Sequence, residues 1–416
     1  TNRLSDLLHL LDEPTIGQHP RDIRNLIQAL GELAGPVIYV EHDRIAAAGA
    51  NAALDLGPGA GKQGGRILFA GSPADLWQAD TPTGKYFSGR QQTRIPQKRT
   101  HPESFLTIKG AHLHNLQELD IPIALNRFNV VCGVSGSGKS TFVEEVLFAS
   151  LEAGEAIGCL GLNQLKLKAE LVDQSPIGRN PRSNPATYTK LLDPIRDCYA
   201  ANTGLDATNF SFNTKQGACE VCQGMGAVEV KLRYLPSTWI TCSECEGERF
   251  SDEVLAAKVT FSDGISRSIA DFLNLTISES GPLLREAPGL SERAREDCGR
   301  LCQALIDIGL GYLTLGQPSP TLSGGEAQRV KLAKYLGRRG LKDRLVILDE
   351  PTTGLHPADV NGLLVILDRL VRAGGTVVIV EHELDVIRAG DWLIELGPGA
   401  GPEGGVLLHA GPIERL

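Results

Sequence analysis

A glycine-rich segment near the middle of the chain has the residue types and spacing of a phosphate-binding loop. It reads Gly133-Val-Ser-Gly-Ser-Gly138-Lys139-Ser140, which fits the pattern GxxxxGK[ST]. Glycines let successive backbone N–H groups point at phosphate oxygens, and the helix that follows adds the partial positive charge of its N-terminus. The lysine of such a loop pairs with the β- and γ-phosphates, and the serine hydroxyl binds Mg²⁺. We expect ATP–Mg²⁺ to bind through Gly133, Ser135, Gly136, Gly138, Lys139, Ser140 and Thr141.

Acidic residues follow a short apolar run that is typical of a buried strand, residues 345–348. A carboxylate at the end of a strand beside a phosphate-binding loop holds Mg²⁺, and this role falls to Asp349. Glu350 is then placed to orient or deprotonate the attacking water. A second run rich in β-branched residues ends at His382, whose imidazole is expected to contact the γ-phosphate.

Four of the nine cysteines form two pairs, Cys219-x2-Cys222 and Cys242-x2-Cys245, with nineteen residues between the pairs. This spacing is typical of a tetrahedral zinc site with four thiolates. An iron–sulfur cluster is the alternative, with no other feature in its favour. Since four protein ligands fill the coordination shell, we expect a structural Zn²⁺. Gly224 and Gly247 suit tight turns whose N–H groups donate to the sulfurs.

The other cysteines have no such spacing. Cys298 and Cys302 are one helical turn apart among leucines and are interpreted as small core residues. The same interpretation applies to Cys132, Cys159 and Cys198.

A long-period repeat organises the chain. The segment Leu11-Asp-Glu-Pro-Thr15 recurs as Leu348-Asp-Glu-Pro-Thr352, and Glu41-His42 recurs as Glu381-His382. A repeat of this length indicates two homologous domains. Asp12, Glu13 and His42 are therefore the first-copy counterparts of Asp349, Glu350 and His382. Only 11 residues precede Asp12, so we expect the chain to lack its true start.

The expected organisation has three parts: residues 1–88 as the C-terminal remnant of a first ATPase domain, 89–104 as a linker, and 105–416 as a second ATPase domain. Within the second domain we expect a zinc module at about 212–251 and a further subdomain at about 252–340; the resemblances described below imply DNA contact for the first and an ATPase signature for the second. The basic stretch with Arg90, Arg94, Lys98 and Arg99 is interpreted as a solvated tether. The expected fold class is α/β, a P-loop ATPase domain with an inserted four-cysteine module.

The composition sets further bounds. The chain has 416 residues, 42% of them hydrophobic and 22% charged, which is ordinary for globular proteins. No uncharged apolar run reaches the roughly 18 residues that span a bilayer, and we expect a cytoplasmic protein with no membrane partner. The net charge of −9 argues against a chain that is basic overall and binds nucleic acid by that charge.

One segment resembles the signature motif of ABC ATPases. It begins at Leu322 and contains Ser323, Gly324, Gly325, Glu326 and Gln328. Ser323 suits an N-cap, with Glu326 closing a capping box. The resemblance implies that this helix N-terminus clamps a γ-phosphate held by a partner domain. It also implies that Gln174 is the Q-loop glutamine, which contacts Mg²⁺ and relays the nucleotide state.

The chain as a whole resembles the UvrA family, the damage-recognition subunits of bacterial excinucleases. The residues that carry this resemblance are 172–179 (VDQSPIGR), 181–188 (PRSNPATY), 321–332 (TLSGGEAQRVKL), the inserted CxxC pairs and the repeated LDEPT and LGPGAG segments. The resemblance implies a dimeric ATPase of nucleotide excision repair and the SOS response. Such a protein binds damaged double-stranded DNA and loads the excinuclease B subunit. It also implies that a hairpin at Glu229 to Thr241 contacts DNA.

Charge in the module offers DNA little attraction. From Phe212 to Ser251 there are four basic and five acidic residues, 4 − 5 = −1, whereas phosphate neutralisation dominates non-specific affinity. Tyr234 and Trp239 are candidates for stacking on bases, or for packing across the hairpin.

Two other functions remain open at this point. One is a paralogue with the same ATPase that gives resistance to DNA-binding drugs. The other is a nucleotide-gated DNA-binding module with little turnover. In this family the P-loop of one domain faces the signature of the other, so we expect this chain alone to hydrolyse ATP weakly.

Overall fold

The computed structural model describes residues 7–15, 18, 20–59, 64–97, 99–164, 166–230, 238–336 and 342–413. Two compact units make up the chain. The first unit comprises Thr1–Asp173 and Gly340–Leu416, and the second is the inserted segment Gln174–Arg339. The second unit therefore contains the expected zinc module and signature subdomain, together with residues 174–211 that precede them.

A six-stranded sheet forms the centre of the first unit, in the order β17-β16-β7-β15-β14-β9. Five strands run parallel and the edge strand β17 is antiparallel to β16. The strands read as nearly continuous apolar runs because helices and a second sheet cover a parallel sheet on both faces; every residue of β15 is buried. The strands are β7 (Phe128–Gly133), β9 (Lys168–Val172), β14 (Arg344–Asp349), β15 (Thr376–Val380), β16 (Trp392–Gly397) and β17 (Val406–Pro412).

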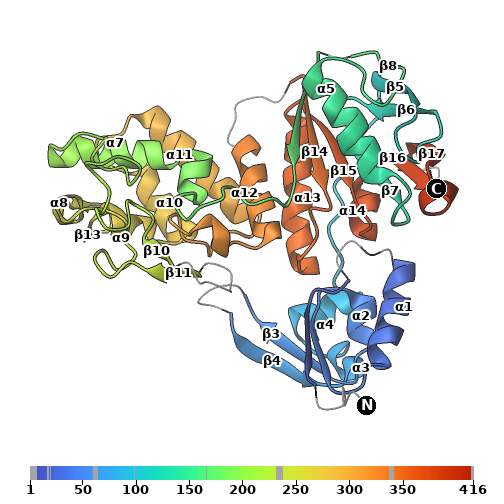
Figure 1. Cartoon of the computed structure of the whole chain (residues 1–416), viewed down its shortest axis with the longest axis horizontal. Helices are drawn as coiled ribbons and strands as arrows, with labels where there is room; N and C mark the ends of the chain where they lie inside the picture. The colour runs from blue at the N-terminus through green and yellow to red at the C-terminus, as the bar shows by residue number, and fades with distance from the viewer. Residues whose placement is uncertain are drawn as a thin grey trace. The chain divides into compact units, whose positions relative to one another are not determined.

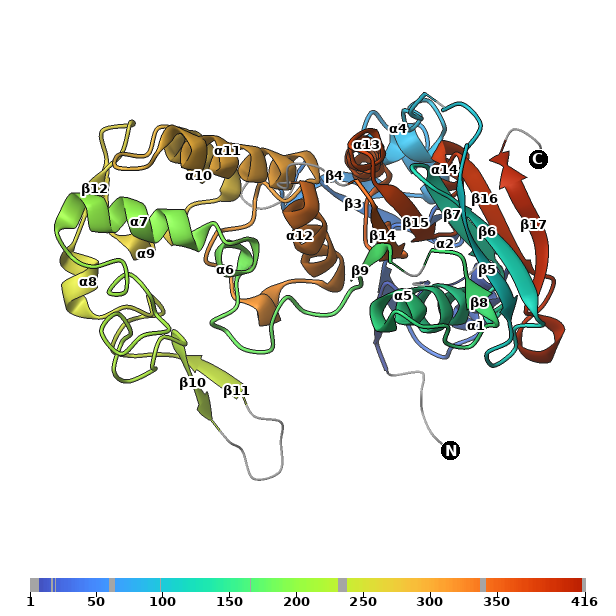
Figure 2. The ribbon, with the colours of Figure 1, turned by 90° about the horizontal axis from the view of Figure 1, so that it is seen from above.

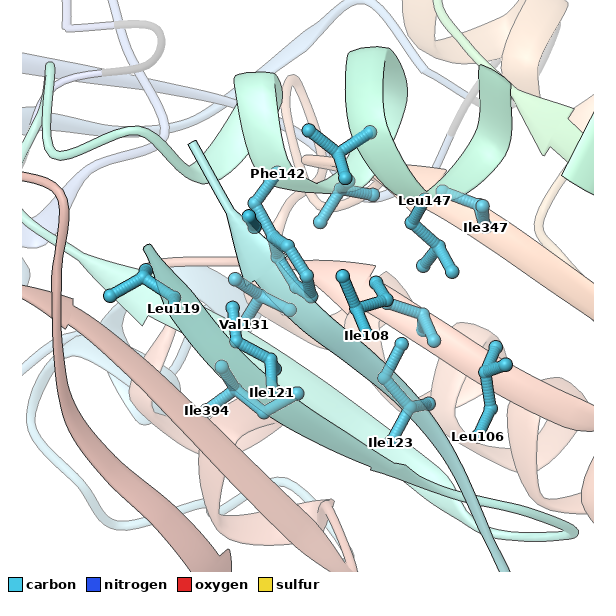
Figure 3. Packing of buried hydrophobic residues seen from close by; sticks show 14 of the residues in the cluster. Leu106, Ile108, Leu119, Ile121, Ile123, Val131, Phe142, Leu147, Ile347 and Ile394 are labelled. Atoms are coloured by element: carbon cyan, nitrogen blue, oxygen red, sulfur yellow. The ribbon is translucent and has the colours of Figure 1, made fainter. Parts of the chain in front are cut away.

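A smaller antiparallel sheet and the helix after the P-loop enclose the main core of this unit. The sheet has the order β6-β5-β8. Figure 3 shows Phe142 and Leu147 of that helix directed at Ile108, Val131 and Ile347. The elements are β5 (Phe105–Ala111), β6 (Leu119–Ala124), β8 (Gly161–Leu162), the π-type helix η3 (Thr141–Phe148), α5 (Ala149–Ala153), α13 (Pro357–Arg372), α14 (Leu384–Ala389) and η5 (Gly401–Glu403). The expected α/β ATPase fold is confirmed (Figure 1).

The first copy of the repeat has the same local structure as the second. Its strands β1 and β2 are parallel and pair Asp12 with Val40, just as β14 and β15 pair Asp349 with Val380. The elements of this copy are β1 (His9–Asp12), α1 (Pro20–Gly31), β2 (Val37–Val40), α2 (Arg44–Ala48), β3 (Ala53–Gly57), β4 (Arg66–Gly71), α3 (Pro73–Leu76) and α4 (Pro82–Phe87). The repeat in sequence is thus a repeat in structure.

The basic stretch after α4 is anchored rather than solvated. Arg99 forms ion pairs with Asp391 and Asp368, whose side chains are only 5% and 15% exposed. The backbone N–H of Arg94 donates to Asn361 at 2.6 Å. The expectation of a solvated tether is therefore wrong at Arg99, because a basic composition does not reveal which carboxylates lie opposite, whereas Arg90 and Arg94 are exposed as expected. Lys98 lies outside the described residues.

The second unit is mostly helical. Helices α10 and α11 pack against each other, and α12 packs against α11 and α6. In Figure 2 the hairpin of β10 and β11 extends away from α7 and α11. The elements are α6 (Pro185–Thr189), α7 (Leu192–Thr203), β10 (Ala227–Val230), β11 (Thr238–Thr241), α8 (Asp252–Ala256), β12 (Val259–Thr260), β13 (Ser266–Arg267), α9 (Ile269–Leu273), α10 (Ile277–Arg285), α11 (Glu292–Asp307), η4 (Ser319–Thr321) and α12 (Gly324–Leu336).

Among the helices in the described ranges, none combines the length and the apolar character needed to cross a bilayer.

Candidate functional site

The P-loop connects β7 to η3, and its backbone requires glycine. Gly133 has φ +142°, and a Cβ placed there would lie 2.0 Å from the carbonyl oxygen of Leu396. Gly136 and Gly138 also have positive φ. Lys139 folds back over the loop, and its Nζ donates to the carbonyls of Gly133 (3.0 Å) and Val134 (2.9 Å). The carbonyl groups of the P-loop therefore hold the Lys139 amine, which is expected to bind the phosphates.

A second loop supports the P-loop from the side. The backbone N–H of Gly401 donates to the carbonyl of Gly136 at 3.0 Å. Asn115 joins the two loops, since its Nδ2 lies 3.2 Å from the carbonyl oxygens of Gly136 and of Gly401. The repeated LGPGAG segment marked one of these loops in the sequence, but no signal there pointed to Asn115.

Asp349 is the last residue of β14. One strand, β15, lies between β14 and the P-loop strand β7, and the strand register pairs Val131 with Val380 and Val380 with Asp349. Burial lowers the pKa of Lys139, and the nearby carboxylates of Glu350 and Asp349 oppose that change. Burial and the charge of Glu350 raise the pKa of Asp349. The lysine and the two carboxylates are thus close enough to influence one another, as a bound metal and triphosphate require.

Glu350 and His382 form a pair at the ends of neighbouring strands. Glu350 has φ +41°, and its N–H donates to the carbonyl of Val380 at 3.0 Å. This left-handed conformation turns the side chain toward the end of β15. The Nε2 atom of His382 lies 3.3 Å from Oε1 of Glu350. The general base and the histidine expected from the sequence are thus brought together.

A third acid, Glu381, fixes the turn that carries these residues. Its carboxylate is 2% exposed and accepts bonds from the N–H (2.9 Å) and hydroxyl (2.6 Å) of Thr352 and from the N–H of His382 (3.0 Å). Burial raises the pKa of Glu381, and these donors oppose the rise. The sequence interpretation gave Glu381 no role. Its recurrence as Glu41 before His42 was the available signal.

The first copy repeats this arrangement. Glu13 has φ +44°, and His42 Nε2 lies 3.3 Å from its Oε1. Glu41 accepts bonds from the N–H and hydroxyl of Thr15 at 2.9 and 2.8 Å. The pairs Glu13–His42 and Glu350–His382 line one cavity of about 170 Å³. Asp12 ends β1, as Asp349 ends β14.

The signature motif begins α12 in the second unit, and the expected capping box is present. Glu326 N–H donates to Ser323 Oγ at 3.2 Å, and Ser323 N–H donates to Glu326 Oε2 at 2.7 Å. The hydroxyl of Tyr312 donates to the other oxygen of Glu326. Gln328 is buried, and the carbonyl of Gly325 accepts a bond from Arg329 at 3.2 Å. The N-terminus of α12 is thereby held rigidly.

Gln174, which the resemblance implies is the Q-loop glutamine, lies beside this motif. A Cβ built on Gly324 would be 3.5 Å from Cβ of Gln174, and both residues belong to the second unit. The P-loop, Asp349, Glu350 and His382 belong to the first unit. The site residues expected from the sequence are therefore divided between two units.

The four paired cysteines converge on one point of the second unit. Their sulfurs all lie within 4.8 Å of one another, and the residues are 1–7% exposed. The Cys222 and Cys245 sulfurs are 3.6 Å apart. Four sulfurs at Zn–S distances of about 2.3 Å have edges of about 3.8 Å, so the separation fits a tetrahedral ion. The residues that would hold zinc are Cys219, Cys222, Cys242 and Cys245.

Backbone donors stabilise thiolates at this site. Gly226 N–H lies 3.2 Å from Cys222 Sγ, and Arg249 N–H lies 3.4 Å from Cys245 Sγ. Hydrogen bonds from Cys245, Glu244 and neighbouring thiols lower the pKa of Cys242 to about 7, with the Cys245 N–H as the main cause. Gly224 and Gly247 adopt positive φ in the two turns, as expected. The donor set suits a cation that prefers sulfur.

The hairpin β10–β11 rises from this site. Val228 and Ile240 are directly opposite each other and are 42% and 55% exposed, and Trp239 is 42% exposed. Tyr234 lies outside the described residues. The five remaining cysteines are not part of the cluster: Cys159, Cys198, Cys298 and Cys302 are buried and Cys132 is partly buried.

Comparisons with known proteins agree with these motifs. No family model matches the chain. UvrABC system protein A of Thermus thermophilus is 43% identical over an alignment of 432 positions, which covers 99% of this chain and 44% of that protein. The Bacillus subtilis protein of the same name is 42% identical over 100% of this chain and 44% of its own length. The crystal structure of UvrA2 from Deinococcus radiodurans matches with a TM-score of 0.88 and 42% identity, over 98% of this chain and 50% of that one.

This chain spans about half the length of the relatives it matches. The likeness nevertheless extends over nearly all of its own residues. The chain therefore belongs to the UvrA family of ABC ATPases.

Proposed function

We propose that this chain binds ATP–Mg²⁺ and carries the general base, histidine and phosphate loop of a DNA-damage recognition ATPase. The observation that carries the proposal is the grouping of Lys139, Asp349, Glu350 and His382 at the ends of adjacent parallel strands. Lys139 and the P-loop N–H groups would bind the phosphates. Ser140 and Asp349 would hold Mg²⁺, which would neutralise charge on the phosphates.

Glu350 is the residue that would orient and deprotonate the attacking water. Its left-handed backbone and its bond to Val380 fix the carboxylate beyond the strand ends. His382 then contacts the carboxylate from the neighbouring strand and is placed to donate to the γ-phosphate. Gln174 is proposed as the Q-loop glutamine that reports the nucleotide state to the signature motif, since it lies beside Gly324.

Turnover by this chain alone is proposed to be slow. The sequence contains one GxxxxGK[ST] segment and one LSGGE segment. Charge that develops on the γ-phosphate needs donors already in place on the opposite wall of the site. In this proposal those donors are Ser323 to Glu326 of another copy, paired head to tail. Turnover per chain would then rise with protein concentration.

The wider function is nucleotide excision repair. In the full-length protein we propose binding to damaged double-stranded DNA, contact with the excinuclease B subunit, and a homodimer. The membership in the UvrA family and the exposed hairpin residues Val228, Trp239 and Ile240 support a nucleic-acid contact at the zinc module. A nucleotide-gated DNA-binding module with little turnover is the second candidate, favoured by the placement of P-loop and signature in different units.

Nucleotide binding is the direct test. Calorimetry should detect binding of ATP–Mg²⁺ to the chain, and Lys139→Ala should remove most of the affinity. Lys109→Ala, an exposed lysine of the same unit, is the matched control and should bind normally. Equal affinity of the Lys139 variant and the wild type would show that the P-loop assignment is wrong.

DNA binding separates the two candidates. Binding to duplexes with and without a helix-distorting lesion is measured with and without ATP, alongside phosphate release. A preference for the lesion with turnover that rises with concentration supports the repair ATPase. Nucleotide-dependent DNA binding without measurable turnover at any concentration supports the gated module.

A further inference from the structure

Arg249 lies between the four-cysteine cluster and the segment that leads into the signature motif. Its side chain is buried, at 8% exposure for the residue, and its backbone has φ +74°. The backbone touches both halves of the cluster. Its carbonyl accepts a bond from Cys219 N–H at 2.9 Å, and its N–H donates to Cys245 Sγ at 3.4 Å. Both cysteine pairs are thus tied to one residue.

The guanidinium of Arg249 is shielded from solvent and contacts few groups that could offset the cost of burying its charge. Nη2 donates to the carbonyl of Gly316 at 3.0 Å, and the group lies 5.6 Å from the centre of the Phe212 ring. Nη1 is buried and has no partner among the described residues. A buried cation costs free energy unless negative charge is close.

A zinc tetrathiolate supplies that negative charge. Four thiolates around one Zn²⁺ leave a net charge of about −2. Groups outside the ligand shell that donate to or face such ligands tune the metal affinity by about 10- to 100-fold. Arg249 is therefore suited to balance the charge of the loaded cluster.

Through Gly316, the guanidinium of Arg249 also contacts the segment that leads to the signature helix α12. Gly316 is fixed by its own N–H bond to Leu273 at 2.8 Å. Three residues later, Ser319 is 1% exposed and is held on both sides. Its N–H donates to the carbonyl of Ser183 at 2.7 Å, and its hydroxyl donates to that of Gly178 at 2.8 Å. The short helix η4 then leads directly to Ser323, the N-cap of α12.

A second arginine joins the cluster to the same region. Arg182 donates to the carbonyl of Gln223, which follows Cys222 in the first cysteine turn. Arg182 is next to Ser183, the residue that binds Ser319. The cysteine cluster is thus connected at both of its turns to the residues that hold the 316–323 segment.

We propose that Arg249 is a positioning residue that balances the charge of the loaded zinc site and, through Gly316, holds the 316–323 segment and the start of the signature helix in place. A change at the zinc module is thereby transmitted to the residues that clamp the γ-phosphate. That consequence rests on the proposed ATPase function, whereas the placement of Arg249 does not.

Two variants of the full chain test the proposal. Arg249→Met keeps the bulk and removes the charge. Arg249→Lys keeps the charge, but a single ammonium cannot reproduce the planar, two-sided guanidinium contact. The readouts are zinc affinity by competition with a chelator and hydrogen exchange of amides 317–326 by mass spectrometry, both without nucleotide. Arg267→Met, whose arginine pairs with Asp263 elsewhere in this unit, is the matched control.

We expect Arg249→Met to weaken zinc affinity by about 10- to 100-fold. In the zinc-loaded variant, amides 317–326 should exchange about 10-fold faster, with no change in peptides of the P-loop. Arg249→Lys should keep near-normal zinc affinity and still exchange faster at 317–326, so the proposal can be tested even if the Met variant does not fold. Unchanged exchange in zinc-loaded Arg249→Lys would overturn the link to the signature segment. Unchanged zinc affinity in a folded Arg249→Met would overturn the charge balance.

These outcomes are independent of the proposed function. Neither measurement uses ATP. The zinc affinity and the hydrogen exchange can therefore be interpreted even if the chain does not bind nucleotide. A positive result here with no ATP binding would retain the zinc-to-signature link and remove only its catalytic consequence.

Discussion

The Nε2 atom of His382 lies 3.3 Å from Oε1 of Glu350, and the same separation joins His42 and Glu13 in the first copy of the repeat. In each copy the glutamate of this pair, Glu13 or Glu350, has a left-handed backbone. A second glutamate, Glu41 or Glu381, accepts a hydrogen bond from the threonine that lies two residues after the first glutamate. Two separate segments therefore build the same glutamate–histidine geometry. The residue types recur in the same order in both copies, because each of them has a defined contact.

Glu350→Gln is expected to keep ATP binding and to lose nearly all turnover. The amide preserves the size of the side chain but cannot accept a proton from water, and general-base catalysis contributes about 10²- to 10⁴-fold. Phosphate release and calorimetry measure the two properties separately. Exposed Glu152→Gln is the control and should hydrolyse at the wild-type rate. Turnover of the Glu350 variant within twofold of wild type would assign the base elsewhere.

The double variant Cys219→Ser/Cys242→Ser is expected to lose the bound metal. One thiolate is removed from each pair, so no tetrahedral set remains, and structural zinc contributes about 10–16 kcal/mol of apparent binding free energy. Metal analysis should find one zinc per wild-type chain and little in the variant. Cys298→Ser/Cys302→Ser should retain the ion, because these thiols lie outside the cluster. Full zinc content in the first variant would contradict the ligand assignment.

Gly133→Ala is expected to distort the P-loop. The new Cβ would lie 2.0 Å from the carbonyl oxygen of Leu396, and φ +142° is unfavourable for alanine. We expect a loss of about 2 kcal/mol in the free energy of unfolding, with strongly reduced ATP binding. Gly161→Ala meets no atom within 4 Å and serves as the control in thermal denaturation and calorimetry. An alanine variant that binds ATP normally would show that the loop tolerates the side chain.

Arg99→Met is expected to destabilise the first unit by about 3 kcal/mol, because it leaves the Asp391 carboxylate without its cation, whereas Asp368 keeps its ion pair with Arg372. Chemical denaturation measures the loss. Arg388→Met removes an exposed pair with Asp385 and should cost about 0–1 kcal/mol. Similar small losses in both variants would mean that solvent compensates Asp391 and Asp368.

His356 is expected to make stability depend on pH. Burial lowers its pKa, with Asp359 and Asp55 opposing and His42 adding to the effect, and its Nε2 lies 3.1 Å from Thr83 Oγ1. Between the lowered pKa and about 6.5 the unfolded chain binds a proton that the folded chain does not, so stability falls as pH decreases through this window. His356→Gln should unfold with a shallower pH dependence than wild type. His101→Gln, at an exposed position, should keep the wild-type slope. Equal slopes in wild type and His356→Gln would contradict the assignment.

The sequence alone determined the chemistry that depends on local spacing. The P-loop, the strand-end carboxylates, the capping box at Ser323 and the paired cysteines are each specified within a few residues, because phosphate binding, helix capping and metal binding need fixed short separations. The repeat also predicted from sequence that Glu13 and His42 would have counterparts. The α/β fold followed from these motifs and the apolar strands between them.

Only the tertiary structure decided which distant residues meet. Asn115 joins two loops that are 265 residues apart in sequence (401 − 136 = 265), and Arg99 finds Asp368 and Asp391 far along the chain. The tether interpretation failed for this reason: composition shows that a stretch is basic, but not which buried carboxylate lies opposite. Glu381 and Arg249 were likewise missed, because their roles depend on burial and on partners that long-range packing brings close.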